Sequence, residues 1–159
     1  MTIKATLVYI ERNNQILMIH RNKREKDLHL GKYNGLGGKL DPNETLEDCA
    51  KREVLEESGL VLLNLFKKGE ILFPKFDKFG NDWEVHIYYS NEFSGDLIAE
   101  NPEGTLVWIP KDKLLELNLW EGDKLFISRV FKDEEFRGTL YYQDGVLDSK
   151  QQQIIETIG

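Results

Sequence analysis

Three glutamates crowd one short segment of this chain. Glu53, Glu56 and Glu57 fall within five residues of the stretch GKLDPNETLEDCAKREVLEESGL, residues 38–60. Like charges three or four residues apart repel one another on a helix. At about 100° per residue, the face that carries Glu53 and Glu57 also carries small and apolar residues, namely Leu46, Cys49 and Ala50, with Glu56 at its edge. Carboxylates on such a face must be protonated, paired with cations or bound to metal.

The composition of this cluster favours a hard divalent ion. Ligands that offer only oxygen suit Mg²⁺ or Mn²⁺ better than zinc. The alternative is an ordinary amphipathic helix whose acids pair with Lys51 and Arg52 at a solvated surface. The helix itself is delimited at both ends, because Thr45 with Asp48 fits a capping box and Gly59 fits the terminating position. We therefore expect a helix over residues 45–58.

Length and charge narrow the class of protein. The chain has 159 residues, a mass of 18.5 kDa and a net charge of −7. We expect one domain, residues 1–159, that does not coat nucleic acid by neutralising phosphates. A small anionic substrate would need local cations against this field. The single cysteine, Cys49, allows no internal disulfide, and apolar runs such as LVYI are too short to span a membrane. Because no signal peptide is evident, we expect a cytoplasmic protein without a membrane partner.

Strands and helices alternate along the rest of the chain. We expect strands at 4–11 and 15–21 around a turn at Asn13–Asn14, a polar loop at 21–38, and strands at 70–79 and 83–93 around a turn at 80–82. A strand at 105–109, helices at 111–117 and 121–133, and β structure at 137–144 follow, and the last ten residues stay unassigned. His86 is expected to be a core histidine with satisfied hydrogen bonds. This pattern predicts an α/β sandwich with a mixed sheet.

The acidic segment resembles the Nudix box, G-x5-E-x7-R-E-U-x-E-E-x-G-U with U aliphatic. It matches every fixed position, through Gly38, Glu44, Arg52, Glu53, Val54, Glu56, Glu57, Gly59 and Leu60. The resemblance implies the Nudix α/β/α sandwich with a mixed central sheet. It also implies a hydrolase of nucleoside diphosphates linked to another group, dependent on Mg²⁺ or Mn²⁺.

The same resemblance implies roles for the box residues. The metal ligands would be Glu53, Glu56 and Glu57, assisted by the backbone carbonyl of Gly37 or Gly38. Arg52 and Glu44 would orient the glutamates. Metal ions would neutralise the phosphate oxygens, and Glu53 would orient or deprotonate the attacking water. Family members differ over which glutamate is the base, so that choice stays open.

The chain resembles, from about residue 4 to 149, the MutT-type oxidised-purine nucleoside triphosphatases, most of all the mammalian type. The segments that carry this resemblance are KYNGLGGKL, KGEILFPKF, WEVHIYY, NLWEGDKLF and FRGTLYY. It implies that Thr6 lines the base pocket, Asn34 bonds the purine edge, Trp120 packs on the base, Asp123 reads the base and Arg21 approaches the phosphates. It also implies a further metal ligand, Glu103, with Glu100 as second choice.

One position departs from this branch. The mammalian-type enzymes carry two adjacent aspartates after the tryptophan, whereas this chain has Gly122 followed by Asp123. The expected activity is hydrolysis of 8-oxo-dGTP to monophosphate and pyrophosphate in nucleotide-pool sanitation, by a monomer or homodimer acting on a small-molecule nucleotide. The alternatives are another nucleoside triphosphate, a dinucleotide, ADP-ribose or an RNA 5′ end as substrate, or a non-catalytic nucleotide-binding regulator.

Overall fold

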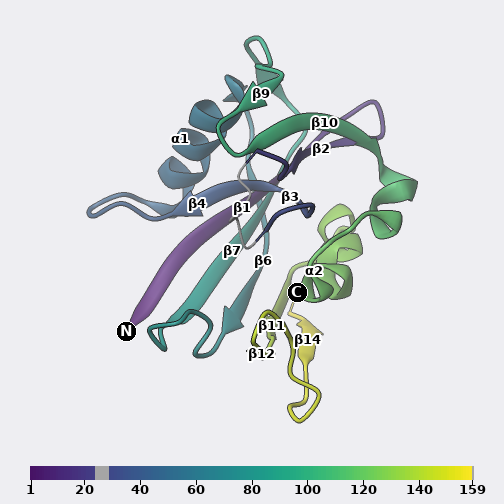
Figure 1. Ribbon diagram of the computed structural model, residues 1–159. Helices are drawn as coiled ribbons and strands as arrows, with labels where there is room; N and C mark the ends of the chain where they lie inside the picture. The colour runs from purple at the N-terminus through teal and green to yellow at the C-terminus, as the bar shows by residue number, and fades with distance from the viewer. Residues whose placement is uncertain (24–28, 159) are drawn as a thin grey trace.

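A computed structural model describes residues 1–23 and 29–158. Within these ranges, ten strands form one mixed sheet in the order β14-β11-β6-β7-β1-β2-β10-β9, with β3 paired to β2 and β4 to β1 (Figure 1). The strands are β1 (Thr2–Arg12), β2 (Gln15–His20), β3 (Tyr33–Asn34), β4 (Leu36–Lys39), β6 (Phe66–Phe73), β7 (Asp82–Ser90), β9 (Glu100–Asn101), β10 (Gly104–Pro110), β11 (Phe136–Thr139) and β14 (Ile154–Thr157). Short pairs join β5 (Val61–Leu62) to β8 (Phe93–Ser94) and β12 (Tyr142–Gln143) to β13 (Val146–Leu147).

The sheet separates two hydrophobic cores. Successive side chains of a strand point to opposite faces, so β1 contributes to both. Val8 and Ile10 pack with Ala50 of α1 (Leu46–Ser58), whereas Tyr9 packs with Phe126 at the end of α2 (Glu121–Phe126). Figure 1 shows α1 on one side of the sheet and α2 on the other, together with the 3₁₀ helices η1 (Lys111–Glu116) and η2 (Ile127–Phe131). The expected α/β sandwich with a mixed central sheet is confirmed.

Helix α1 begins and ends where the sequence predicts. The side chain of Thr45 accepts a hydrogen bond from the Asp48 N–H at 3.1 Å, and Gly59 ends the helix in the left-handed region at φ 81°. Cys49, Ala50 and Val54 are buried against the sheet. The helix is therefore fixed in rotation about its axis, and this fixes the directions of its glutamates.

Other boundaries differ from the predicted ones. The turn at Asn13–Asn14 is present, with φ of 52° and 60°. The strand expected at 70–79 begins at Phe66 and ends at Phe73, because Pro74 lacks an N–H for the sheet and Asp77 then organises a loop by accepting from the Phe79 N–H. The helix expected at 121–133 is divided into α2 and η2, and the helix expected at 111–117 is the 3₁₀ helix η1. Part of the unassigned C-terminal segment forms β14 beside β11.

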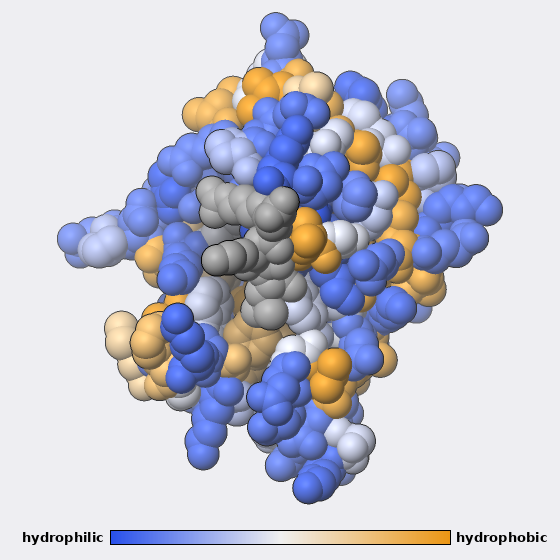
Figure 2. Space-filling model, in the orientation of Figure 1, coloured by the Kyte–Doolittle hydropathy of each residue, from blue (hydrophilic) through white to orange (hydrophobic). Residues whose placement is uncertain are grey.

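The visible surface is mainly polar. Figure 2 shows hydrophilic residues over most of this face, with apolar residues in separate groups. In the described ranges, no helix combines the length and apolar character that crossing a membrane requires.

Candidate active site

Two glutamates of α1 reach back over the glycines of β4. The Gly37 N–H donates to Glu57 Oε1 at 2.8 Å. A Cβ atom added at Gly38 would lie 2.5 Å from the carboxyl carbon of Glu53, closer than real contacts allow. Glycine at this position thus lets a carboxylate lie directly against the strand backbone. Because β4 pairs with the central strand β1, the β4 backbone is a rigid support for both carboxylates.

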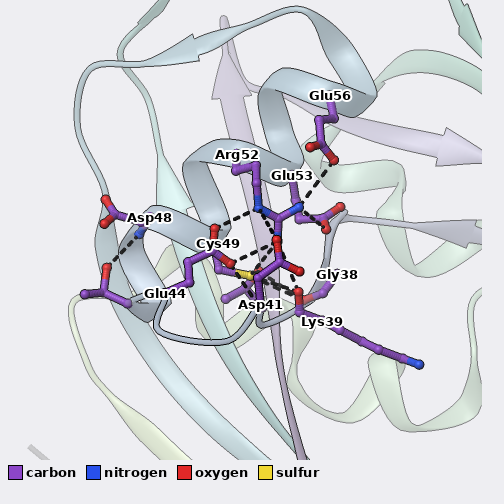
Figure 3. A network of polar contacts seen from close by, with 11 residues as sticks. Gly38, Lys39, Asp41, Glu44, Asp48, Cys49, Arg52, Glu53 and Glu56 are labelled. Atoms are coloured by element: carbon purple, nitrogen blue, oxygen red, sulfur yellow. Dashed lines mark hydrogen bonds and ion pairs between the residues drawn. The ribbon is translucent and has the colours of Figure 1, made fainter.

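Arg52 holds the opposite side of the cluster (Figure 3). Its Nε and Nη2 donate to the two carboxylate oxygens of Glu44 at 2.7 and 3.0 Å, a two-point contact, and Nη1 donates to Glu53 Oε1 at 2.8 Å. Nη1 also reaches Glu56 Oε2 at 3.3 Å. The hydrogen bonds from Arg52 help lower the pKa of the Glu44 carboxyl to about 2. Charge-assisted contacts of this kind lock the direction of Glu53.

The Glu57 carboxylate lacks comparable compensation. Burial raises the pKa of Glu57 to about 8, and the negative charges of Glu103 and Glu53 add to this, against the Gly37 N–H and the charge of Arg21. Glu56 differs, because its side chain is 59% exposed and contacts Arg52. Glu53 and Glu57 are thus the inward-facing pair of the three box glutamates, and Glu56 lies at the solvent edge.

A loop brings a fourth carboxylate to the same place. The Asn101 side chain donates to the Glu57 carbonyl at 3.0 Å and accepts from the Glu103 N–H at 2.9 Å, so it ties the β9–β10 turn to the end of α1. Arg21 Nη1 lies 3.6 Å from Glu103 Oε2. Glu100 instead pairs with Lys23 at 3.0 Å and is exposed. The structure therefore groups Glu103, rather than Glu100, with the box glutamates.

The donor set fits a hard divalent cation. Glu53, Glu57 and Glu103 supply only oxygen atoms, and burial, together with the negative charges of Glu103 and Glu53, opposes ionisation of Glu57. The Gly38 carbonyl is approached by Thr6 Oγ1 at 3.5 Å and by Cys49 Sγ at 3.6 Å. Among the described residues, no side chain donates a hydrogen bond of this kind to the Gly37 carbonyl, which is therefore the available backbone oxygen.

A second group of side chains lies around Trp120. The Trp120 indole N–H donates to His29 Nδ1 at 2.8 Å, and Lys32 Nζ lies 5.2 Å from the centre of the indole ring. Lys32 also donates to the Leu119 carbonyl at 3.3 Å. Burial raises the pKa of Asp123 to about 7, and Lys32 opposes this shift. An aromatic face, a cation and a carboxyl group that changes charge near neutral pH are thus close together.

Two buried polar atoms nearby lack hydrogen-bond partners in the described part of the chain. They are the Tyr9 hydroxyl and the Asn34 side-chain nitrogen. Burial raises the pKa of Tyr9, and the charge of Asp123 adds to this shift, so the two groups lie within electrostatic reach of one another. Unpaired buried polar groups are rare in folded proteins. These atoms are therefore candidates to bond a ligand.

The structure explains the glycine at position 122. Its N–H donates to the Tyr142 hydroxyl at 2.7 Å, and a Cβ atom there would lie 2.6 Å from that hydroxyl. Tyr142 thus fills the space that a side chain at 122 would need. It also packs edge-on against Trp120, with ring centres 6.2 Å apart.

The residues singled out from the sequence fall into two groups and one exception. The carboxylate cluster brings together Arg21, Gly37, Gly38, Arg52, Glu53, Glu56, Glu57 and Glu103. Trp120 lies with Asp123 in the second group. Thr6 is buried on the α1 face of β1, where it contacts Gly38 and Cys49. Four residues of the second group are not among those predicted for the site, namely Tyr9, Lys32, His29 and Tyr142. Two of them, Lys32 and Tyr142, lie within the segments KYNGLGGKL and FRGTLYY that carry the family resemblance.

This fold and this carboxylate cluster define a Nudix protein. The chain belongs to the Nudix family, since the family model for the NUDIX domain matches residues 1–130. Among curated proteins, it is 31% identical to the oxidized purine nucleoside triphosphate hydrolase of Danio rerio, over 94% of each chain. The protein of the same name from Mus musculus is 32% identical over 87% of this chain and 86% of its own. A MutT protein from Bacillus halodurans has a similar structure, with a TM-score of 0.84, 27% identity and 97% of each chain covered.

Proposed function

We propose that this Nudix hydrolase converts oxidised purine nucleoside triphosphates such as 8-oxo-dGTP to monophosphate and pyrophosphate. Its cofactor would be Mg²⁺ or Mn²⁺, and residues 1–159 would act as one catalytic domain. The observation that carries the proposal is the approach of Glu53 and Glu57 to the β4 glycines, with Glu103 close enough to Glu57 to help raise its pKa to about 8. The vertebrate relatives, which are hydrolases of oxidised purine nucleoside triphosphates by name, support the choice of substrate.

The carboxylates would hold the metal, and the arginines would position its surroundings. Glu53, Glu57 and Glu103 would be the inner ligands, with the Gly37 carbonyl, and Glu56 would join from the solvent edge. Divalent ions bound there neutralise phosphate oxygens and lower the pKa of a bound water. Arg21, 3.6 Å from Glu103, would approach the phosphates.

Glu53 is the best-placed group to orient or deprotonate the attacking water. Its carboxylate is held by Arg52 at 2.8 Å, and Arg52 is in turn fixed at two points by Glu44. A catalytic base must be held in a narrow range of directions to act in the transition state. The exposed and less constrained Glu56 fits this role less well.

The Trp120 group would recognise the base. The indole offers a stacking face, and Asn34 offers both a donor and an acceptor to the purine edge. An 8-oxidised purine presents an N7–H donor and an additional oxygen. A pocket whose buried polar groups pair with these atoms discriminates against normal purines, because an unpaired buried group costs about 1–3 kcal/mol. Asp123 and the Tyr9 hydroxyl are the groups available for this pairing.

A substrate panel tests the proposal. Purified protein with Mg²⁺ is incubated with 8-oxo-dGTP, 2-oxo-dATP, dGTP, dATP, ADP-ribose and a diadenosine polyphosphate, and each product is quantified by chromatography. We expect preferential hydrolysis of an oxidised purine triphosphate to its monophosphate, and loss of this activity in Glu53→Gln. Equal rates on dGTP, or activity confined to ADP-ribose or the dinucleotide, would refute the substrate assignment. Nucleotide binding without turnover would indicate the regulator alternative.

A further inference from the structure

A second cluster of metal-ligating side chains lies on β6 and β7, outside the Nudix box. Glu70 of β6 pairs in register with His86 of β7, and Glu84 lies two residues before His86 on the same strand. Residues two apart on a strand share a face, so the three side chains meet on one side of the sheet. One ligand atom from each lies within 4.8 Å of the others.

His86 is held in one orientation by Glu84. The imidazole is only 4% exposed, and its Nε2 lies 2.6 Å from Glu84 Oε1. An ionised carboxylate can only accept, so this contact places the imidazole proton on Nε2. A carboxylate that fixes the far nitrogen of a histidine in this way is a common partner of metal-ligating histidines.

The other nitrogen of His86 has no hydrogen-bond partner among the described residues. Nδ1 is fully enclosed and faces Glu70 Oε2 at 3.6 Å. The sequence prediction of a core histidine with satisfied hydrogen bonds is therefore wrong for this atom. With the proton on Nε2, Nδ1 presents a lone pair towards a carboxylate oxygen, and two such acceptors repel one another.

The separation of these two atoms fits a bridging cation. A distance of 3.6 Å is too long for a hydrogen bond. Two ligands of one tetrahedral Zn²⁺, each bonded at about 2.0–2.1 Å, lie about 3.4 Å apart. The second oxygen of Glu70 is already occupied, since Arg137 Nε and Nη2 both lie 3.0 Å from Oε1. Oε2 therefore remains for an ion.

We propose that His86 Nδ1 and Glu70 Oε2 bind a divalent cation of the zinc class, with Glu84 positioning the imidazole. Imidazole combined with carboxylate suits Zn²⁺, whereas Mg²⁺ takes oxygen ligands. A pocket of about 210 Å³, lined in part by Glu70, Glu84, Arg137 and Thr139, adjoins the cluster and gives room for water ligands. The ion would join β6 to β7 and stabilise the sheet independently of the box and of the proposed substrate.

Calorimetric titration of Zn²⁺ into the full chain tests the proposal, with excess Mg²⁺ present to occupy the box. Glu70→Gln is the main variant, because it keeps the shape of a partly exposed side chain while removing the charge. Glu116→Gln is the matched control at an exposed position on η1. We expect one Zn²⁺ to bind to the wild type and to the control, and Glu70→Gln to weaken binding about 10- to 100-fold. Equal affinity in Glu70→Gln would overturn the assignment.

A spectroscopic readout separates this site from the box and from a purely structural role. Zn²⁺ binding at Nδ1 shifts the ¹⁵N resonance of that nitrogen, and we expect the same shift in the Glu56→Gln variant. The contrary result is that the ¹⁵N resonances of the wild-type His86 imidazole do not change on addition of Zn²⁺ and show protons on both nitrogens near neutral pH. His86 would then be an imidazolium between two glutamates, and the metal site would be refuted. His86→Gln, with folding checked by circular dichroism, should lose the bound ion as Glu70→Gln does.

Discussion

Replacing Glu57 by glutamine should change how the stability of the metal-free protein depends on pH. The pKa of this carboxyl is about 8 in the folded chain, against an ordinary value of 4.5. Between these values the folded protein holds a proton that the unfolded chain has released. The free energy of unfolding therefore falls with rising pH, by about 1.4 kcal/mol per pH unit for a fully formed difference. Stability from the neutral carboxyl is complete below pH 4.5 and lost as pH rises through 8.

The size of the effect follows from the same pair of values. From pH 5 to pH 9 the full difference amounts to about 4 kcal/mol, and partial solvent access reduces the expected loss to about 2–4 kcal/mol. Glutamine does not titrate and retains an oxygen that can accept from the Gly37 N–H. The wild type should therefore lose stability relative to Glu57→Gln as pH rises, although the variant has lost a metal ligand.

Urea unfolding at several pH values, with a chelator present, measures this difference. Contributions from other groups that titrate equally in both proteins, such as Asp123, cancel in the comparison. Adding Mg²⁺ at pH 9 should restore the wild type and leave the variant nearly unchanged, since a ligand stabilises only the form that binds it. A difference between the two proteins that stays constant from pH 5 to pH 9 would refute the reasoning that Glu57 is neutral in the metal-free fold.

Three further substitutions probe the parts of the site separately. Arg52→Lys loses the two-point contact with Glu44. Steady-state kinetics should show kcat lowered about 10- to 100-fold with little change in KM. An unchanged kcat would show that Arg52 does not orient Glu53. Gly38→Ala places a methyl group against the Glu53 carboxylate and should lower kcat at least about tenfold. The Tm measured by calorimetry should fall little, because the flexible Glu53 side chain can move. A large fall in Tm with normal activity would contradict this prediction. Asp123→Asn keeps a side-chain N–H donor and cannot ionise, so KM for 8-oxo-dGTP below pH 7 should stay near the wild-type value, by steady-state kinetics. In the wild type, KM should rise above pH 7 as Asp123 loses its donor proton, and this rise should vanish in the variant; equal pH profiles would exclude Asp123 from base recognition.

The carboxylate cluster is the part of the molecule that sequence predicts well. Helix period, the cap at Thr45 and the stop at Gly59 are local features, so the shared face of Glu53 and Glu57 follows from spacing alone. The choice between Glu103 and Glu100 does not, because the Asn101 side chain decides it through a contact with the carbonyl of a residue 44 positions earlier. Such contacts depend on how distant segments pack.

The base pocket was less predictable for the same reason. Gly122 looks like a lost carboxylate in the sequence, yet the structure fills its space with the hydroxyl of Tyr142, twenty residues away. Tyr9 reads as a core residue because it lies in the continuous apolar run LVYI of β1, and its unpaired hydroxyl becomes evident only when its surroundings are known. The strand that ends at Phe73 is followed by a local signal for its end, Pro74. The alternation of apolar and polar residues continues past Pro74, and this concealed the boundary in the sequence.

Because β1 lies in the centre of the sheet, its pairing also affects how the chain folds during synthesis. Thr2–Arg12 leaves the ribosome before its parallel neighbour, which begins at Asp82 and is made only after the whole Nudix box. At about 5–20 residues per second, the intervening residues 13–81 take about 3–14 s to appear. The metal ligands of α1 therefore exist for seconds on a nascent chain whose sheet is incomplete, with one long edge of β1 unpaired. Completion of β7 would then pair this edge and remove an exposed strand from an aggregation-prone intermediate.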